Sequence, residues 1–190
     1  MQAKNLYIIA GPNGSGKSTF AKEFLPLYVH CPSFINTDVI AQGLSFSPEQ
    51  AAIKAGRIVL KQIDQYAAQQ KDFGFETTLS GKSYARTFEK LKSEGYKISL
   101  FFLWLPDVHL SLARIKHRVS KGGHNVPEKD VRRRFQRAID NFRTIYKDRA
   151  DNWMFFDNST EKPHLIASFA DGKLSIEDKA RYEAIFKVNL

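Results

Sequence analysis

The sequence is poor in cysteine and has no long hydrophobic segment. Cys31 is the single cysteine among 190 residues, which excludes an internal disulfide and favours a reducing compartment. The longest apolar run, Ile98–Leu105, is too short to cross a bilayer. The opening residues lead directly into an apolar run, so we expect no signal peptide, no membrane attachment and a cytoplasmic location. Repeats, low-complexity tracts, linkers and His/Cys zinc patterns are also missing, which favours a single domain over residues 1–190.

The distribution of charge is uneven. The formal net charge is +9, and the segment Arg114–Arg149 alone holds twelve Lys/Arg against four Asp/Glu. Nearly the whole imbalance therefore lies in this one segment. Such a block is typical of a nucleic-acid-binding surface or of an arginine lid that closes over phosphate groups.

The stretch Gly11–Ser18, GPNGSGKS, matches the phosphate-binding pattern G-x-x-x-x-G-K-[ST] at every fixed position. It follows the apolar run Leu6–Ala10, which predicts a buried strand. A predicted helix, Thr19–Leu25, comes next and stops near Pro26. In this setting the loop backbone and the positive end of the helix close on a polyphosphate.

We therefore predict that the chain binds a nucleoside triphosphate, ATP or GTP, together with Mg²⁺. Lys17 is expected to reach the β- and γ-phosphates, and Ser18 to ligate the metal ion. No conventional Walker B aspartate is evident, since Asp107 is better explained as the start of a helix. The residues of the predicted nucleotide-binding loop are Gly11, Pro12, Asn13, Gly14, Ser15, Gly16, Lys17, Ser18 and Thr19.

Strands alternate with helices along the rest of the chain, which predicts a parallel sheet with helices on both faces. The pattern indicates an α/β protein with the three-layer α/β/α fold of P-loop NTPases. We expect a mainly parallel sheet of five to six strands and an arginine-bearing lid at about residues 114–137. Further strands are expected at residues 33–36, 73–77, 98–105, 153–156 and 165–170.

In such sheets ligands bind at the carboxyl ends of the strands, which selects several polar residues. Asp38 either takes the proton of an acceptor hydroxyl or caps the helix that follows, and the pattern leaves both open. Glu76, before Thr77 and Thr78, could bind a sugar or ribose hydroxyl, hold Mg²⁺ through water, or be a solvated strand end. Asn158 lies either near the nucleotide base or in a plain turn.

Two arginine-bearing helix ends flank a predicted glycine hinge. Arg114 and Arg118 share one face of a helix, and residues 132–137 place four arginines at the start of the next, across Gly122-Gly123-His124. Arginine suits a lid because its fixed fork matches phosphate oxygens. The alternative is a solvated basic face, and the spacing does not show which arginines point inward.

In combination these motifs resemble the zeta-toxin-like P-loop kinases, particularly their short bacterial members. The resemblance covers roughly residues Asn5–Asn158. Besides the nucleotide-binding loop it rests on three stretches, of which the last two in this order are the most specific. They are Asn36-Thr37-Asp38, Phe75-Glu76-Thr77-Thr78, and Gly122-Gly123-His124-Asn125-Val126-Pro127 followed by Arg133-Arg134-Phe135.

The resemblance implies transfer of phosphate from ATP to the sugar of UDP-N-acetylglucosamine or a related acceptor. By that resemblance Asp38 is the catalytic base and Glu76 contacts the substrate, with Thr77 and Thr78 beside it. Arg118 and one of Arg133 and Arg134 then clamp the phosphate. Some family members are toxins held in check by an antitoxin, so an antitoxin-like protein partner is a further expectation.

Three functions are compatible with these features. The leading hypothesis is a kinase that phosphorylates a hydroxyl of a nucleotide sugar or nucleotide-like metabolite. The second is a polynucleotide 5′-hydroxyl kinase, which is disfavoured because no aromatic stripe interleaves the basic block as a stacking platform would. The third is an ATP-dependent switch without an acceptor, which is disfavoured by the missing Walker B aspartate and by Asp38.

Overall fold

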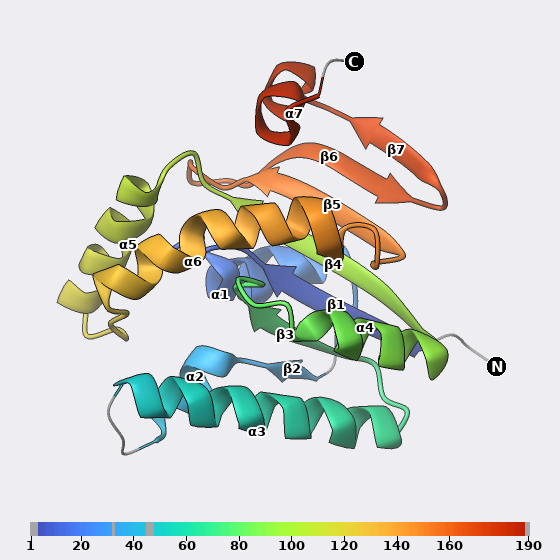
Figure 1. Cartoon of the computed structure of the whole chain (residues 1–190), viewed down its shortest axis with the longest axis horizontal. Helices are drawn as coiled ribbons and strands as arrows, with labels where there is room; N and C mark the ends of the chain where they lie inside the picture. Colours follow the sequence, from blue (N-terminus) through green and yellow to red (C-terminus); the bar gives the residue numbers. More distant parts are fainter. Residues whose placement is uncertain (1–3, 32, 45–47, 189–190) are drawn as a thin grey trace.

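A computed structural model describes residues 4–31, 33–44 and 48–188 of the chain. Within these residues the strands form one seven-stranded sheet, drawn in Figure 1. In spatial order the strands are β2 (Phe34–Ile35), β3 (Phe73–Thr77), β1 (Lys4–Ala10), β4 (Tyr96–Trp104), β5 (Asn152–Asp157), β6 (His164–Ala170) and β7 (Lys173–Ile176). The helices are α1 (Lys17–Thr19), α2 (Thr37–Gln42), α3 (Pro48–Ala68), α4 (Tyr84–Ser93), α5 (Val108–Ser120), α6 (Glu128–Asn141) and α7 (Lys179–Phe186).

The five strands from β2 to β5 run parallel, and the last two pair antiparallel. This confirms the predicted mainly parallel α/β fold and the central place of β4, although the sheet has seven strands rather than five to six. The missed strand is β7, a four-residue edge strand with a mostly exposed side-chain pattern. Asp171 and Gly172, both at positive φ, join it to β6 in a tight hairpin turn.

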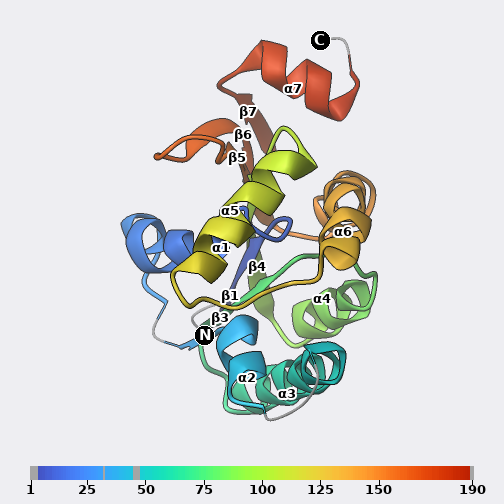
Figure 2. The ribbon, with the colours of Figure 1, turned by 90° about the vertical axis from the view of Figure 1, so that its left-hand side faces the viewer.

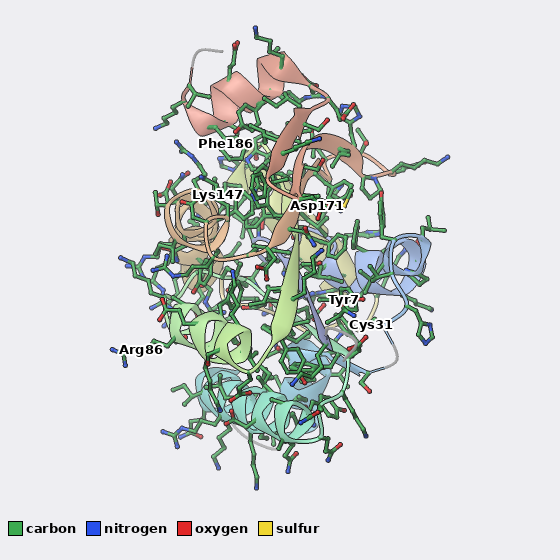
Figure 3. All side chains as sticks on the ribbon, turned by 90° about the vertical axis from the view of Figure 1, so that its right-hand side faces the viewer. Tyr7, Cys31, Arg86, Lys147, Asp171 and Phe186 are labelled. Carbon is green, nitrogen blue, oxygen red and sulfur yellow. The ribbon has the colours of Figure 1, made fainter. Side chains whose placement is uncertain are left out.

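Alternating side chains of the central strands divide the core in two. Leu6 and Ile8 of β1 pack with residues of α3, α4, α6 and α7 in one buried cluster. Tyr7 and Ile9 face the opposite side and pack with Phe20 and Leu25, just after α1. Figure 2 shows α1 on one side of the sheet and α4 and α6 on the other. Figure 3 places Tyr7 and Cys31 on the α1 side, away from Lys147 and Arg86.

Helices α1 and α6 each continue into turns of another helical type. A π-helical turn over Phe20–Phe24 and a 3₁₀ turn over Leu25–Leu27 extend α1, so the helical segment passes one residue beyond the predicted stop near Pro26. Another π-helical turn, Phe142–Tyr146, extends α6 and completes the helix that the sequence predicts over residues 128–147. Both helices therefore start where the sequence predicts, to within two residues, and position their first turns at the same edge of the sheet.

Candidate active site

A cavity of about 650 Å³ lies where the carboxyl ends of β1 and β3 meet the segment between α5 and α6. Side chains from the nucleotide-binding loop, from the end of β3 and from the first turn of α6 line it together. The sequence-predicted residues in its lining are Asn13, Lys17, Glu76, Thr77, Thr78, Arg133 and Arg134. The predicted residues that lie outside its lining are Gly11, Pro12, Gly14, Ser15, Gly16, Ser18, Thr19, Arg118 and Asn158.

Close packing against α5 fixes the backbone of the nucleotide-binding loop. Gly14 has φ +74°, and a Cβ atom there would lie 2.6 Å from the carbonyl oxygen of Ser111 in α5. The hydroxyl of Ser111 donates a hydrogen bond to the carbonyl of Asn13 inside the protein. Asp107 starts α5 as predicted, because its carboxylate accepts from the backbone N–H of Leu110 at 2.9 Å. The loop therefore rests on the first turns of α5.

Asn158 supports the same loop from the end of β5. Its amide Nδ2 donates to the carbonyl of Ser15 at 2.7 Å, and only 9% of the residue is exposed. Arg114 holds this segment in turn, donating to the carbonyls of Asn158 at 2.7 Å and Ser159 at 2.9 Å. What the structure describes for Asn158 is thus a bond to the loop, while its contact with the nucleotide base stays a prediction.

The loop carries polar groups suited to a polyphosphate. The Lys17 ammonium lies over the loop and donates to the carbonyls of Gly11 at 3.1 Å and Pro12 at 3.0 Å. Among the described residues, Asn13 Oδ1 and Ser15 Oγ are buried and have no hydrogen-bond partner. Buried polar atoms without partners are rare and indicate a missing ligand or water. The Ser15 hydroxyl and the Lys17 ammonium can donate to phosphate oxygens, whereas Asn13 Oδ1 can only accept, so the loop's donors fit a nucleoside triphosphate.

Glu76 lies directly beside Ser18 at the end of β3. The Ser18 hydroxyl is 2.9 Å from Oε2 and 3.2 Å from Oε1 of Glu76, and the glutamate is 2% exposed. Its backbone carbonyl accepts from the hydroxyl of Thr37 at 3.1 Å. Such burial rules out the solvated strand end. A hydroxyl paired with a buried carboxylate is a donor set that fits Mg²⁺, which prefers oxygen ligands and keeps several waters.

The segment after β3 is held in one conformation. Leu79 is buried at φ +52°, a backbone region that is strained for a leucine. Two side chains from the α6 segment hold it, since Asn141 Nδ2 donates to the carbonyl of Leu79 at 2.8 Å and the Tyr146 hydroxyl donates to that of Gly81 at 2.6 Å. Thr77 and Thr78, which directly precede this bonded segment, line the cavity.

The start of α2 resolves one alternative for Asp38. The side chain of Asn36 caps the helix by accepting from the backbone N–H of Val39 at 2.9 Å. The cap is therefore Asn36 and not Asp38, which is the second residue of α2. The side chain of Asp38 lies outside the part of the chain that the structure describes, so its role as base stays a prediction.

Residues 114–137, the predicted lid, contain most of α5, the connection over residues 121–127 and the start of α6. A small buried cluster of Ile115, Val126 and Val131 joins the three parts and is separate from the two cores of the sheet. Gly123 packs against Arg118: its N–H donates to the Arg118 carbonyl at 2.9 Å, and a Cβ atom there would meet Arg118 Cγ. The phosphate-clamping role of Arg118 stays a prediction.

Most of the basic block is engaged with other residues of the chain. Three of its members, Lys129, Arg133 and Arg134, line the cavity. Others bond to residues as distant as Glu89 on α4 and Phe186 on α7. The block is therefore spread over several elements. Members with ion pairs or hydrogen bonds within the described chain include Arg114, Arg132, Arg133, Arg134, Arg143, Lys147 and Arg149.

Several residues of the cavity are not among those that the sequence predicts. Tyr84 lines the cavity and stacks on Phe75 with ring centroids 5.2 Å apart. The sequence pattern predicts it only as part of the apolar face of a helix. Asp130 lies three and four residues before the predicted arginines, a spacing that would have revealed it. The unpredicted polar and charged residues in the lining are Thr37, Tyr84, His124, Asn125, Lys129 and Asp130.

A second cavity, of about 600 Å³, lies on the other side of Ser18, between the α1 segment and β2. Cys31 is part of its lining. Burial raises the pKa of the Cys31 thiol to about 11, so the thiol is protonated at neutral pH and is a poor nucleophile.

Comparison with known proteins decides the family. The model of the family described as zeta toxin matches residues 39–161 of the chain. The chain belongs to the zeta toxin family. A protein of Haemophilus influenzae with no assigned function is 34% identical over 139 residues, which cover 71% of this chain and 94% of that protein. The zeta-toxin-like P-loop kinase prediction is thereby confirmed.

Two solved structures show the same fold at low sequence identity. The AvrRxo1-ORF1:-ORF2 complex with ATP contains a chain that matches with a TM-score of 0.79 at 19% identity over 97% of this chain. The match spans 64% of that longer chain. The PezAT toxin–antitoxin system of Streptococcus pneumoniae matches with a TM-score of 0.70 at 14% identity, over 100% of this chain and 81% of that one. By family and by fold, the present chain is thus a P-loop kinase.

Among the described residues, no helix is both long and apolar enough to span a membrane.

Proposed function

We propose that this zeta-toxin-family kinase transfers the γ-phosphate of ATP to a hydroxyl of a nucleotide sugar or nucleotide-like metabolite. One observation carries the proposal. Lys17 is the proposed triphosphate ligand, and Glu76 lies beside Ser18, the proposed metal ligand. Both line the same cavity as Thr77 and the lid arginine Arg133. The residues proposed to bind the donor and those proposed to bind the acceptor therefore line one cavity, which supports direct transfer between two substrates.

The residues of the loop account for donor binding. Backbone N–H groups and Lys17 hold the triphosphate, and Lys17 exchanges its present bonds to the loop carbonyls for phosphate oxygens. Ser18 and Glu76 would hold Mg²⁺, which supplies charge neutralisation at the β- and γ-phosphates. Asn13, whose Oδ1 is buried without a partner among the described residues, also lines the cavity.

In the transfer step the acceptor hydroxyl oxygen forms a bond to the γ-phosphorus while the bond from that phosphorus to the β–γ bridging oxygen breaks. ADP leaves, and the hydroxyl proton passes to the Asp38 carboxylate. The supports for Asp38 as this base are its place at the start of α2, beside the cavity residue Thr37, and the family resemblance. Arg118 and one of Arg133 and Arg134 offset the charge of the transferring group.

The cavity also bears on the acceptor. Lys129, Arg133 and Arg134 bring three cations to its lid side, which favours an acceptor that carries phosphate of its own. The dispersal of the remaining basic residues over several elements disfavours a polynucleotide as acceptor. The relation to toxin–antitoxin structures makes an antitoxin-like protein partner a second element of the proposal.

The first experiment is a transfer assay with Mg²⁺ and ATP or GTP against UDP-sugars, nucleotides, a metabolite extract and 5′-hydroxyl oligonucleotides, read by mass spectrometry. We expect the wild type to add one phosphate to a nucleotide-like acceptor. Asp38→Asn should lower transfer by about 10²–10⁴-fold, the usual contribution of a general base, and leave ATP affinity within about threefold.

Asp64→Asn is the matched control, because it removes an exposed carboxylate of α3 that pairs with Lys90 outside the cavity. It should behave as the wild type. Near-normal transfer by Asp38→Asn would remove the base role. Phosphorylation of oligonucleotides alone would support the polynucleotide kinase, and ATP consumption without any phosphorylated product would support the switch.

A further inference from the structure

Asp130 is a nearly buried carboxylate in the wall of the cavity. It is the third residue of α6, it is 9% exposed, and it belongs to the cavity lining together with the two arginines that follow it. Its Oδ1 atom accepts a hydrogen bond from Nη2 of Arg133 at 2.6 Å. Its Oδ2 atom lies 4.0 Å from Nη2 of Arg134, an ion pair without a hydrogen bond. One carboxylate therefore faces both Arg133 and Arg134, one of which is predicted to clamp the phosphate together with Arg118.

Helical geometry explains this arrangement. Residues three and four positions apart lie on one face of a helix, so Arg133 and Arg134 both reach back to Asp130. Without this carboxylate, the cavity would bring Lys17, Lys129 and both arginines together with less opposing charge. A guanidinium group has five N–H donors, and the short bond to Asp130 uses Nη2 of Arg133. The group is thus oriented while other donors stay available to a phosphate.

We propose that Asp130 is a positioning residue for phosphate transfer. It fixes the guanidinium of Arg133 toward the cavity through a hydrogen bond and restrains Arg134 electrostatically, so that both are in place when the phosphoryl group is transferred. The inference rests on the proposed kinase function and assigns to this carboxylate a role that neither the sequence motifs nor the family match defines.

The competing explanation is that Asp130 only stabilises the start of α6. Acidic residues in a first helical turn interact favourably with the helix dipole wherever their side chains point. Glu128, two residues earlier in the same turn, supplies the comparison. It is exposed, it pairs with Arg132 at 2.7 Å, and neither of the two lines the cavity. Asp130→Asn and Glu128→Gln each remove one negative charge from the first turn of α6. Only Asp130→Asn also removes a contact with Arg133 and Arg134.

The test measures binding of ADP–Mg²⁺, alone and with aluminium fluoride as a mimic of the transferring phosphoryl group, by isothermal titration calorimetry. We expect the mimic to tighten ADP binding to the wild type by about 100-fold or more, as transition-state analogues do. In Asp130→Asn the ratio of ADP affinities with and without the mimic should fall by about tenfold or more, the size typical of a lost supporting contact. The affinity for ADP alone should change by less than about threefold. Asp130→Glu should recover part of the loss, and Glu128→Gln should match the wild type.

A double variant separates action through the arginine from other effects. If Asp130 acts mainly through Arg133, adding Asp130→Asn to the Arg133→Ala variant should reduce the tightening of ADP binding by the mimic much less than Asp130→Asn does in the wild type. The proposal is overturned if Asp130→Asn and Glu128→Gln behave alike, or if Asp130→Asn weakens ADP alone as much as the mimic complex. Failure of the wild type to bind ADP or ATP at all would instead overturn the proposed kinase function.

Discussion

At the scale of single residues, the chemistry of the site depends on a few contacts between segments far apart in the sequence. Ser18 and Glu76 are 58 residues apart and meet because β1 and β3 are neighbours in the sheet. The sequence showed no Walker B aspartate at the end of the strand where one is usually sought. In this chain the carboxylate that faces the P-loop serine comes from β3 instead. Since Glu76 is buried against a hydroxyl, removing its charge should act on the metal ion and not on the fold alone.

Glu76→Gln tests this assignment. The amide keeps the size and one acceptor oxygen but loses the negative charge, so Mg²⁺ should bind more weakly while ATP still contacts Lys17 and the loop. We expect the Mg²⁺ concentration that gives half-maximal transfer to rise by about 10–100-fold, as for other lost metal-supporting groups. Glu89→Gln, which removes an exposed carboxylate of α4, is the control. An unchanged Mg²⁺ requirement combined with a weaker acceptor would assign Glu76 to substrate binding instead.

At the scale of helices and loops, the sequence predicted those elements that depend on local signals. The apolar run of β4, the glycine-rich loop and the apolar stripe of α6 each define an element without knowledge of its neighbours. The strand β7 escaped prediction because four mostly exposed residues acquire their conformation by pairing with β6. Contacts such as Asn141 with the carbonyl of Leu79 span 62 residues, and no local pattern encodes them.

Glycine substitutions should separate the tightly packed P-loop from an ordinary helix. Gly14→Ala adds a methyl group 2.6 Å from a backbone carbonyl of α5 at a positive φ, whereas Gly56→Ala in α3 adds one with nothing within 4 Å. The first change should destabilise the protein by about 1–3 kcal/mol and abolish ATP binding. The second should stabilise it by about 0.5–1 kcal/mol because alanine is the better helix former.

Urea unfolding at equilibrium checks both signs, and ATP titration checks the functional effect. A Gly14→Ala protein that is stable and binds ATP normally would show that the loop adapts to the added methyl group. Loss of stability in Gly56→Ala would show that the packing of α3 is tighter than the structure indicates.

At the scale of the whole molecule, most of the buried phenol groups lie on the face of the sheet opposite α1. Burial raises the pKa of Tyr84, Tyr96 and Tyr182, which belong to the core shared by α3, α4, α6 and α7 or pack against it. It raises that of Tyr146, which is fully buried, to about 12. On the α1 side, burial raises the pKa values of Tyr7 and of Cys31 beside it in the core (Figure 3). Both layers that flank the sheet therefore resist deprotonation at high pH.

These shifts predict a loss of stability in alkaline solution. When the folded state has the higher pKa, it holds more protons than the unfolded chain between the two values, so the free energy of unfolding falls as pH rises. The contribution is fully present below about pH 9 and is lost as pH rises from there toward 12. For Tyr146 the shift corresponds to on the order of 2–3 kcal/mol in the free energy of unfolding.

We expect the urea midpoint to fall between pH 8 and pH 11, together with the appearance of phenolate absorbance on unfolding. Tyr146→Phe, which cannot ionise, should be less stable at pH 8 because it loses the bond to Gly81, but it should show a shallower dependence on pH. Equal slopes for the variant and the wild type would show that Tyr146 titrates normally in the folded protein.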